Sequence, residues 1–483
     1  MTRHLSAATL QDLPPGVRRP RYDRVNVEPG IVHIGPGAFH RVHQAWYAEQ
    51  WLATDPRWGI TAVSLRNPTL RDALQAQDWL YALAILDERE SFEVIGSLCG
   101  VKVAGDSPDV LSSSIAGPAT RLVTLTVTEK GYCLDGGSRL DLHHADIRHD
   151  LSRPESPRSA IGFLVEGLRL RRARQLPAVP VLSCDNLAGN GRLLAAAARD
   201  FAAQLDPGLA SWIEAEVAFP CTMVDSITPA TTPALVQRVA TELAMDDRWP
   251  VQRESFMQWV VEEHEALEGP DWARAGVTLT DDVSGYERAK LRLLNGAHST
   301  LAYVGILRGH ETVADAMRDT ALAAFVRDLM RDDVAPTLRP VRGLDFDGYI
   351  EAVLRRFSNP AIRHELAQIA WDGSKKLPIR IVGTIQDALA AGAPIERPCV
   401  TLAAWMHFVR RRERAGIVLV DPLAECLARL VREQTTGEAI TDVGAFLALH
   451  EVFPRDLAAD VRFRKTLERA YVRLAVVPAT LLT

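Results

Sequence analysis

Short apolar runs alternate with stretches of helical spacing along the first part of the chain. The apolar runs lie at 30–35, 59–66, 120–132 and 178–186. Stretches with apolar residues at helical spacing occur at 40–52, 159–174 and 190–205. Buried strands that alternate with helices are typical of a mainly parallel sheet covered by helices. The pattern therefore predicts an α/β domain.

Beyond about residue 285 the pattern becomes helical, with almost no strand signal. Apolar residues recur at helical spacing in five segments, at 311–330, 346–357, 378–392, 402–416 and 456–475. The expected organisation is an N-terminal α/β domain over 1–284 and a mainly α-helical domain over 285–483. A junction between two domains is a common place for a ligand cleft.

Composition is that of a globular protein, since 47% of the 483 residues are apolar and 24% are charged. The net charge of -6 gives no reason to expect nucleic acid or an anionic membrane as partner. Arginines cluster at 169–175 and at 408–416, and we interpret both clusters as solvated helix faces.

Neither a membrane span nor a disulfide framework is expected. No apolar run approaches the roughly 18 residues that cross a bilayer, and the N-terminus lacks the apolar core of a signal peptide. The six cysteines are scattered, which favours reduced thiols in the cytoplasm. The pairs His40/His43 and His143/His144 are interpreted as solvated or capping residues rather than metal ligands.

The segment "IVHIGPGAFHR" has the form of a strand, a glycine turn and a helix. Gly35 permits a tight turn, Gly37 lets the backbone approach a pyrophosphate, and a helix N-terminus favours the negative charge. His40 stands where the third glycine of the dinucleotide fingerprint is expected. An ordinary strand–turn–helix explains the segment equally well.

The end of the second strand bears on the choice of cofactor. An acid there binds the ribose 2′-hydroxyl of NAD, but this sequence has Arg66 and Asn67. Arg66 is equally suited to a 2′-phosphate. Cofactor choice therefore stays open at this level.

The segment "VLSCDNLAGNG" puts Asp185 and Asn186 at the carboxyl end of a strand, where ligands bind in open α/β sheets. Asn186 there either donates to a substrate oxygen or caps the following helix.

Residues 287–303, "ERAKLRLLNGAHSTLAY", read as one helix. At roughly 100° per residue, Lys290, Asn295 and His298 share an arc of about 140° with Glu287. Leucines fall within that arc, so the polar face is expected to be partly enclosed. Spacing alone permits a reaction centre.

Two other patterns overlap this helix. Tyr286-x-x-x-Lys290 matches the tyrosine–lysine pair of short-chain dehydrogenases, but those chains are much shorter and the spacing is a weak signal. Ser284-x-x-Glu287 is also a capping box, which gives Glu287 a structural role as an alternative.

Taken together, the motifs resemble the mannitol dehydrogenase family of zinc-independent polyol dehydrogenases. They are, in chain order, "IVHIGPGAFHRVHQAWY", "TVTEKGY", "SCDNLAGNG", "FPCTMVDSITPATT", "KLRLLNGAH" and "DGSKKLP". One such motif is weak evidence, whereas six in order are strong. The resemblance extends from about residue 29 to the C-terminal region. It implies that residues 1–284 are a Rossmann-type dinucleotide-binding domain and that residues 285–483 are a helical substrate and catalytic domain.

The resemblance implies NAD-dependent hydride transfer between a secondary alcohol and a ketone of a sugar derivative, with no metal. It makes Lys290 the base in oxidation and the acid in reduction. A lysine pKa of about 10.4 must fall to roughly 7–8 for that role, which burial achieves. The other implied positions are Asn186 and Asn295 on the reacting oxygen, His298 positioning the substrate, Glu287 as proton relay, and Asp225, Gln368 and Lys376 on the substrate. Implied cofactor contacts are Gly35, Gly37, Ala38, Phe39, Arg66, Asn67, Thr128, Glu129, Lys130 and Asn186.

One departure indicates the subtype. Mannitol-oxidising members tend to have arginine at the position of Gln368, so this sequence looks closer to the fructuronate reductases (mannonate oxidoreductases). Dehydrogenation of D-mannitol or D-arabinitol is the alternative. A non-catalytic sugar- or nucleotide-binding module is the alternative from another class, and the intact set of polar residues argues against it.

Overall fold

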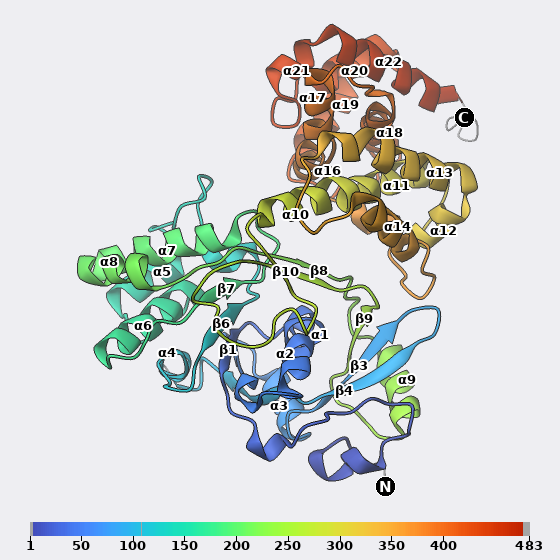
Figure 1. The fold of residues 1–483 in the computed structure, drawn as a ribbon. Coiled ribbons are helices and arrows are strands. Elements are labelled where there is room, and N and C mark those ends of the chain that lie inside the picture. Colours follow the sequence, from blue (N-terminus) through green and yellow to red (C-terminus); the bar gives the residue numbers. More distant parts are fainter. Residues whose placement is uncertain (1–2, 108, 477–483) are drawn as a thin grey trace. The chain divides into compact units, whose positions relative to one another are not determined.

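The computed structural model describes residues 3–107 and 109–476 (Figure 1). The chain divides into two compact units, residues 1–284 and residues 285–483.

The first unit contains a five-stranded parallel sheet. Its strands are β1 (Ile31–Ile34), β2 (Ile60–Ser64), β5 (Leu98–Val103), β6 (Leu122–Leu125) and β7 (Val181–Ser183). The spatial order is β5-β2-β1-β6-β7, and all four pairings are parallel. Counted along the chain, this is the 3-2-1-4-5 order of a doubly wound sheet, with its switch point between β1 and β6. The predicted α/β fold with a mainly parallel sheet is confirmed.

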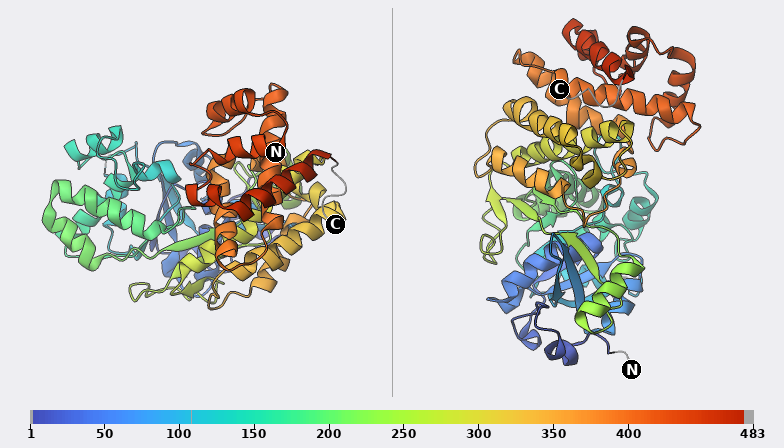
Figure 2. Two further views of the ribbon diagram at one scale, coloured as in Figure 1. Left: turned by 90° about the horizontal axis from the view of Figure 1, so that it is seen from above. Right: turned by 90° about the vertical axis from the view of Figure 1, so that its right-hand side faces the viewer.

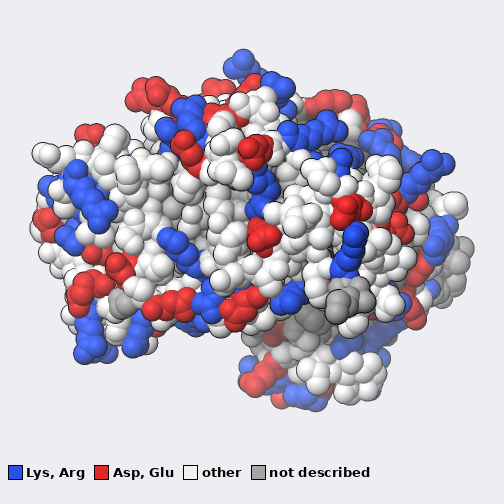
Figure 3. Space-filling model, turned by 90° about the horizontal axis from the view of Figure 1, so that it is seen from below, with Lys and Arg blue, Asp and Glu red and all other residues white. Residues whose placement is uncertain are grey.

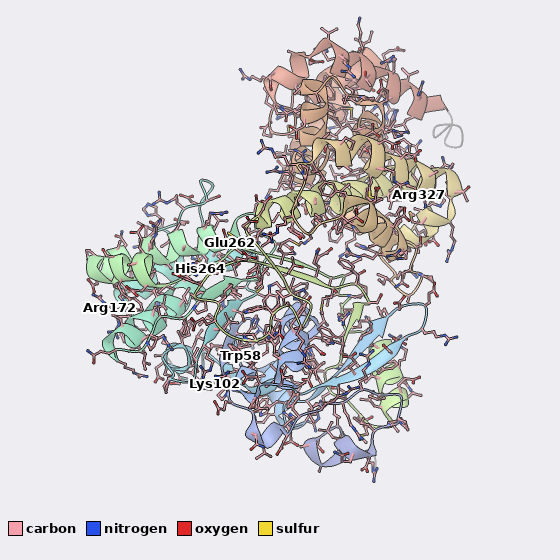
Figure 4. All side chains as sticks on the ribbon, viewed as in Figure 1. Trp58, Lys102, Arg172, Glu262, His264 and Arg327 are labelled. Carbon is pink, nitrogen blue, oxygen red and sulfur yellow. The ribbon has the colours of Figure 1, made fainter. Side chains whose placement is uncertain are left out.

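The two faces of this sheet form separate cores because successive strand residues point to opposite sides. Val32, Ile34 and Val123 lie in one core, while Ile31, Ile60 and Leu122 lie in the other. Helices cover both faces. Those in the first core are α4 (Val110–Ile115), α5 (Ala145–Ser152), α6 (Ala160–Ala173), α7 (Asn190–Leu205) and α8 (Pro207–Glu216) (Figure 2). Those in the second are α1 (Ala38–Val42), α2 (Gln44–Leu52) and α3 (Thr69–Gln75), with Trp58 (Figure 4).

The first unit also contains two three-stranded sheets, which the sequence pattern did not indicate. One has the order β4-β3-β9, from β3 (Tyr81–Leu86), β4 (Ser91–Ile95) and β9 (Val251–Glu254). The other has the order β11-β10-β8, from β8 (Thr222–Asp225), β10 (Gln258–Glu262) and β11 (Thr278–Thr280). Each contains an antiparallel pair. Helix α9 (Pro233–Leu243) packs against the β4-β3-β9 sheet through a small third core.

Two predicted elements of this unit differ from the structure. The helix expected over 40–52 is broken at His43, whose backbone has φ -114° and ψ -90°, between α1 and α2. The strand expected over 120–132 ends at Leu125, and the chain then forms a 3₁₀ turn over Glu129–Tyr132. The other 3₁₀ turns of the chain are Ala7–Asp12, Arg24–Asn26, Pro56–Trp58 and Ala335–Thr337.

The described part of the second unit, residues 285–476, contains helices and no strand, as expected. Its helices are α10 (Val283–Ala289, which begins in the first unit), α11 (Asn295–Leu307), α12 (Val313–Arg318), α13 (Thr320–Asp328), α14 (Phe346–Phe357), α15 (Leu366–Ile369), α16 (Gly373–Leu377), α17 (Gly383–Ala390), α18 (Glu396–Arg414), α19 (Ala424–Gln434), α20 (Ala439–Leu447), α21 (Arg455–Ala459) and α22 (Val461–Val476). Helix α11 is buried over almost its whole length and packs against α15 and α18.

Three π-helical segments interrupt the described part of this unit, at Lys290–Leu294, Leu329–Val334 and Pro378–Val382. The single regular helix expected over 287–303 is therefore wrong in detail, because α10 and α11 are joined by the first segment. The stretch 311–330 is also divided, because Asp319 separates α12 from α13. The first and third π-helical segments pack against each other.

Acidic and basic side chains are interspersed on the face shown in Figure 3. The interpretation of the arginine clusters as solvated faces is wrong for two members. Arg171 is buried and donates to backbone carbonyls of Ile115, Gly117 and Pro177, while buried Arg410 pairs with Asp442 at 2.9 Å. Within the described residues, the helices are all too short or too polar to cross a membrane.

Candidate functional site

A cleft of about 1040 Å³ opens in the first unit at the carboxyl ends of β1, β2 and β6. This is the edge of a doubly wound sheet at which ligands bind. The predicted cofactor residues that line the cleft are Gly35, Gly37, Ala38, Arg66, Asn67, Thr128 and Lys130. Phe39 and Glu129 are not part of the lining. The Phe39 ring stacks on His43 at 4.9 Å, and the Glu129 side chain is exposed.

Gly35 occupies a backbone conformation that requires glycine. Its φ is +89°, and an added Cβ would lie 2.3 Å from the carbonyl oxygen of Thr126. The turn after β1 therefore packs directly on the backbone that follows β6. A side chain at this position would displace one of the two loops that shape the cleft.

His33 holds the glycine turn by hydrogen bonds, and the sequence pattern did not indicate this role. Its Nδ1 lies 2.7 Å from Thr124 Oγ1 and its Nε2 lies 2.9 Å from Thr126 Oγ1. Complete burial lowers the pKa of His33 to about 3, so the ring is neutral. A histidine in the middle of an otherwise apolar strand was the available signal.

Gly37 leaves open space beside the backbone. A Cβ there would meet a single neighbour within 4 Å, the Gly35 carbonyl oxygen at 4.0 Å, so its backbone is accessible from the cleft. The glycine turn and the cleft thus fit the pyrophosphate of a dinucleotide. The dipole of α1 favours a negative charge less than predicted, because this helix ends after five residues. Arg41, buried on α1, adds a cation to the cleft lining.

The end of β2 has no acidic side chain, in line with the sequence. Arg66 is largely exposed and pairs with Asp146 at 3.0 Å. The Asn67 carboxamide oxygen accepts from the backbone N–H of Thr69 at 2.9 Å and from its hydroxyl, so it shapes the entry to α3. Arg66 is the side chain here that is able to reorient toward a ligand.

The loop after β6 is held by Asp185. Its carboxylate accepts from the backbone N–H groups of Val127 (3.0 Å) and Thr128 (2.9 Å), and from the hydroxyl of Tyr132 (2.7 Å). Thr128 has the unusual φ of +65°, so these bonds stabilise a strained loop. Asp185 therefore orders the cleft wall.

Asn190 ties the neighbouring loop to β8, and the sequence pattern did not indicate this role either. Its buried carboxamide donates to the carbonyls of Ser183, Asp185 and Thr222, and accepts from the N–H of Thr222. Such a fully partnered amide rigidifies the segment on which Asn186 lies.

Asn186 and Asp225 lie at the carboxyl ends of two strands of the first unit. Asn186 is exposed in the turn after β7, and the N-cap position of α7 is Gly189. Both interpretations of Asn186, as a donor to the substrate and as a cap, stay predictions. Asp225 is the last residue of β8, is 7% exposed and lies opposite Gln258 in the antiparallel pair.

In the second unit, Lys290 opens the π-helical segment between α10 and α11. Hydrogen bonds of the i→i+5 type wind the chain through fewer degrees per residue than an α-helix does. Lys290 and Asn295 therefore lie closer around the axis than a regular helix would place them. Single π-helical turns inside α-helices often mark functional sites.

Asn295 and His298 follow on α11. The His298 ring lies 4.3 Å from that of Phe357 and 5.1 Å from that of His364, and His298 is only 7% exposed. Its Nε2 has no hydrogen-bond partner among the described residues. Burial, followed by nearby positive groups, holds the pKa of His298 well below its ordinary value, so the ring is neutral.

Lys376 lies on α16, where Nζ donates to the Ile369 carbonyl at 3.4 Å. Burial and the charge of Arg380 lower its pKa. Gln368 is exposed on α15. His298, His364, Lys376 and Arg380 thus form one electrostatically coupled group, which we call the basic cluster.

Tyr286 and Ser284, which belong to the two alternative patterns around Lys290, have structural roles. Tyr286 is 2% exposed and its hydroxyl donates to the Arg342 carbonyl at 3.1 Å, which is the position of a core tyrosine. Ser284 lies inside the first turn of α10 and its hydroxyl donates to Asp282, so it is not an N-cap. The capping-box interpretation of Glu287 is therefore wrong.

The histidine pairs differ from expectation in part. His144 caps α5, because its Nδ1 accepts from the N–H of Asp146. His40 and His43 are fully buried rather than solvated, and His40 stacks on His33 at 3.4 Å. In the described ranges, 3–107 and 109–476, no three His, Cys, Asp or Glu residues are grouped to hold a metal ion.

Comparison with known proteins links both units to one family. Residues 29–274 match the mannitol dehydrogenase Rossmann domain, and residues 282–475 match the mannitol dehydrogenase C-terminal domain. D-mannonate oxidoreductase of Escherichia coli is 40% identical over 475 residues, which cover 96% of this chain and 97% of that protein.

Two solved structures resemble the whole chain. A D-sorbitol dehydrogenase in substrate-free form has a TM-score of 0.92 and 32% identity, and covers 99% of this chain and 100% of its own. Pseudomonas fluorescens mannitol 2-dehydrogenase, in a ternary complex with NAD and D-mannitol, has a TM-score of 0.82 and 38% identity, covering 99% and 98%. With the parallel sheet, glycine turn and helical second unit already described, these matches show that the chain belongs to the mannitol dehydrogenase family.

Proposed function

We propose that this oxidoreductase interconverts D-mannonate and D-fructuronate, a secondary alcohol and the corresponding ketone of a sugar acid, with NAD. Membership of the family makes it a nicotinamide-dependent dehydrogenase of a polyol or sugar acid. The substrate proposal is supported by the near full-length similarity to D-mannonate oxidoreductase and by Gln368. The observation that carries it furthest is the basic cluster, because cations suit an anionic sugar.

Lys290 acts as the base that takes the hydroxyl proton in oxidation and as the acid that returns it in reduction. Its place at the start of a π-helical turn supports this role. Asn186 and Asn295 donate hydrogen bonds to the reacting oxygen as negative charge develops on it. Glu287, three residues before Lys290, passes the proton toward solvent.

Substrate contacts come from His298, Asp225, Gln368 and Lys376. The unpartnered Nε2 of His298 supports its role, since a buried ring nitrogen is stabilised when a substrate hydroxyl bonds to it. In this proposal residues 285–483 are the substrate and catalytic domain, and residues 1–284 bind the dinucleotide.

The dinucleotide is held by the glycine turn and the loops of the cleft, and when bound it accepts or donates the hydride. The predicted contacts are the residues given above for the cleft, together with Phe39, Glu129 and Asn186. We favour NAD over NADP from the habit of the family, and Arg66 is the residue that makes NADP the alternative. No metal takes part in this proposal. The free thiols of all six cysteines fit a cytoplasmic location.

The test is a panel of D-fructuronate, D-fructose, D-mannonate, D-mannitol and D-arabinitol, each with NAD(H) and NADP(H). D-fructuronate with NADH is expected to give the highest kcat/KM. A higher value for D-mannitol or D-arabinitol would favour the polyol alternative, and no turnover of any compound would favour a binding module. A tenfold preference for NADPH would overturn the cofactor assignment.

A further inference from the structure

Arg380 is a cation without an acidic partner in the described part of the chain. It lies in the π-helical segment Pro378–Val382, and its Nη1 donates to the Ser299 hydroxyl at 3.1 Å. Two other half-buried arginines of this unit are neutralised. Arg292 pairs with Asp387 and Arg308 pairs with Asp319, each at 2.6 Å. Arg380 is thus left with most of its five donors unused.

Burial makes this arrangement costly. It lowers the pKa of Arg380 to about 10, and the one opposing influence is the Tyr303 hydroxyl. A partly desolvated guanidinium is stabilised by an anion that offers two acceptor oxygens. Among the described residues, no carboxylate pairs with Arg380, and its one hydrogen bond is to the Ser299 hydroxyl.

The surroundings of Arg380 add positive charge. Lys376 lies four residues earlier in the same helical run, and the charge of Arg380 contributes to lowering its pKa. The charge of Arg380 also lowers the pKa of His298, and the charge of Lys376 lowers the pKa of His364. His298 Nε2 and His364 Nδ1 lack partners among the described residues. These four groups therefore influence one another electrostatically, and the two histidines and Arg380 have hydrogen-bonding capacity left over.

Of the two acids that act on the pKa of Lys376, Asp421 is engaged in other hydrogen bonds. Asp421 accepts from the backbone N–H groups of Ser374 and Leu423, at 2.9 and 2.8 Å. Asp372 and Asp421 raise the pKa of Lys376, but less than burial and Arg380 lower it. The cluster thus retains a net positive character.

We propose that Arg380, supported by Lys376, binds the carboxylate of the substrate and thereby selects sugar acids over uncharged ketoses and polyols. The guanidinium offers two parallel N–H groups to the two carboxylate oxygens. Ser299 orients it, and the Ser299 hydroxyl in turn donates to the Asn295 carbonyl at 3.1 Å. This inference rests on the proposed function, and it adds the residue that recognises the carboxylate of the substrate.

The experiment compares ligands that differ only in this group. D-Fructuronate and D-fructose differ by a carboxylate in place of a CH₂OH group, as do D-mannonate and D-mannitol. We would measure kcat/KM for the ketoses and, from the fluorescence of the ten tryptophans, Kd for D-mannonate and D-mannitol. Wild type, Arg380→Gln and Arg380→Lys are compared, with Lys375→Gln as control, because Lys375 is the exposed cation next to Lys376.

In Arg380→Gln, kcat/KM for D-fructuronate and the affinity for D-mannonate should fall about 10- to 100-fold, the usual effect of losing a charged hydrogen bond. Values for D-fructose and D-mannitol should change less than about threefold, within the range of an uncharged contact. Arg380→Lys should lose less of the acid preference, because it keeps the charge without the fork. Lys375→Gln should change neither.

Equal losses for acid and uncharged ligand in Arg380→Gln would overturn the inference, since a merely structural arginine acts on both. If that variant does not fold, Arg380→Lys decides by the same ratio, and an unchanged ratio overturns the inference. Failure of the proposed function would be seen in the wild type instead. The wild type would then neither turn over D-fructuronate nor bind D-mannonate.

Discussion

The loops of the cofactor cleft in the first unit and the basic cluster in the second unit differ in how far their buried polar groups are hydrogen-bonded. In the loops of the cleft, Asp185, Asn190 and His33 each have several hydrogen-bond partners. In the basic cluster, His298 and His364 have unpartnered nitrogens among the described residues, and Arg380 has a single partner there. A satisfied network holds loops in one shape before a ligand arrives. An unsatisfied cluster gains its missing hydrogen bonds from the ligand.

Not every buried polar group of the first unit has a partner among the described residues, and His40 is one example. Both of its ring nitrogens are buried without partners among the described residues. It lies under the glycine turn, stacked on His33, and not in the lining of the cleft. The difference between the two regions therefore concerns Asp185, Asn190 and His33, which hold the loops of the cleft, rather than every buried polar group of the first unit.

The largest expected effect concerns Lys290. Lys290→Ala should reduce turnover by about 10²–10⁴, the usual loss for a positioned acid–base group. Cofactor affinity should stay unchanged, because the cleft lies within the first unit. Steady-state kinetics and NADH binding by fluorescence measure the two quantities. Arg288→Ala, an exposed cation on the same helix, is the matched control and should have almost no effect.

Asn295→Ala should slow oxidation and reduction alike, by roughly 10²-fold, as expected for the loss of one donor to a developing oxyanion. An amide does not titrate near neutral pH, so the midpoint of the pH–rate profile should stay in place. The pH–rate profiles of this variant and the wild type are compared in both directions. A shift of the midpoint by a full unit would contradict the assigned role.

Gly35→Ala tests the cleft. The added methyl group meets the Thr126 carbonyl, and the φ of +89° is unfavourable for alanine. The free energy of unfolding should fall by about 1–3 kcal/mol, and NADH should bind more weakly. Denaturant unfolding and NADH titration measure both. Gly105→Ala is the control, since a Cβ there meets nothing within 4 Å and Gly105 has no positive φ. Equal behaviour of the two variants would be inconsistent with a constrained turn.

The smallest expected effect is that of metal removal. Activity should survive exhaustive chelation, because the proposed chemistry is assigned to a lysine and two amides. Turnover is measured before and after chelator treatment and buffer exchange. A loss that zinc alone restores would refute this part of the proposal.

Local sequence patterns predicted the main sheet well. The apolar runs of β1, β2, β6 and β7 and the periodicity of Phe346–Phe357 lie within continuous segments, so neighbouring residues carry the signal. The strands Tyr81–Leu86 and Ser91–Ile95 were missed because they lack clear alternation, and their partner β9 is far away in the sequence.

The site was predictable where a motif defines it and unpredictable where partners are distant. Lys290 follows from the family motif, but its π-helical turn does not, since a fixed period of 100° per residue cannot register the change in winding. The contact of His33 with Thr124 joins positions 91 residues apart. Arg380 lies in an ordinary apolar segment, and nothing in the sequence indicates that its side chain lacks an acidic partner among the described residues.

The most direct test of the central claim, that Lys290 exchanges the proton of the reacting alcohol, is the pH dependence of the wild-type enzyme in both directions. Oxidation of D-mannonate needs the neutral lysine, so its rate should rise with pH. Reduction of D-fructuronate needs the protonated lysine, so its rate should fall over the same interval. Both profiles should share one midpoint, and the residual activity of Lys290→Ala should lose it. Profiles that move in the same direction, or a folded Lys290→Ala variant that keeps more than about a tenth of wild-type turnover, would contradict the account.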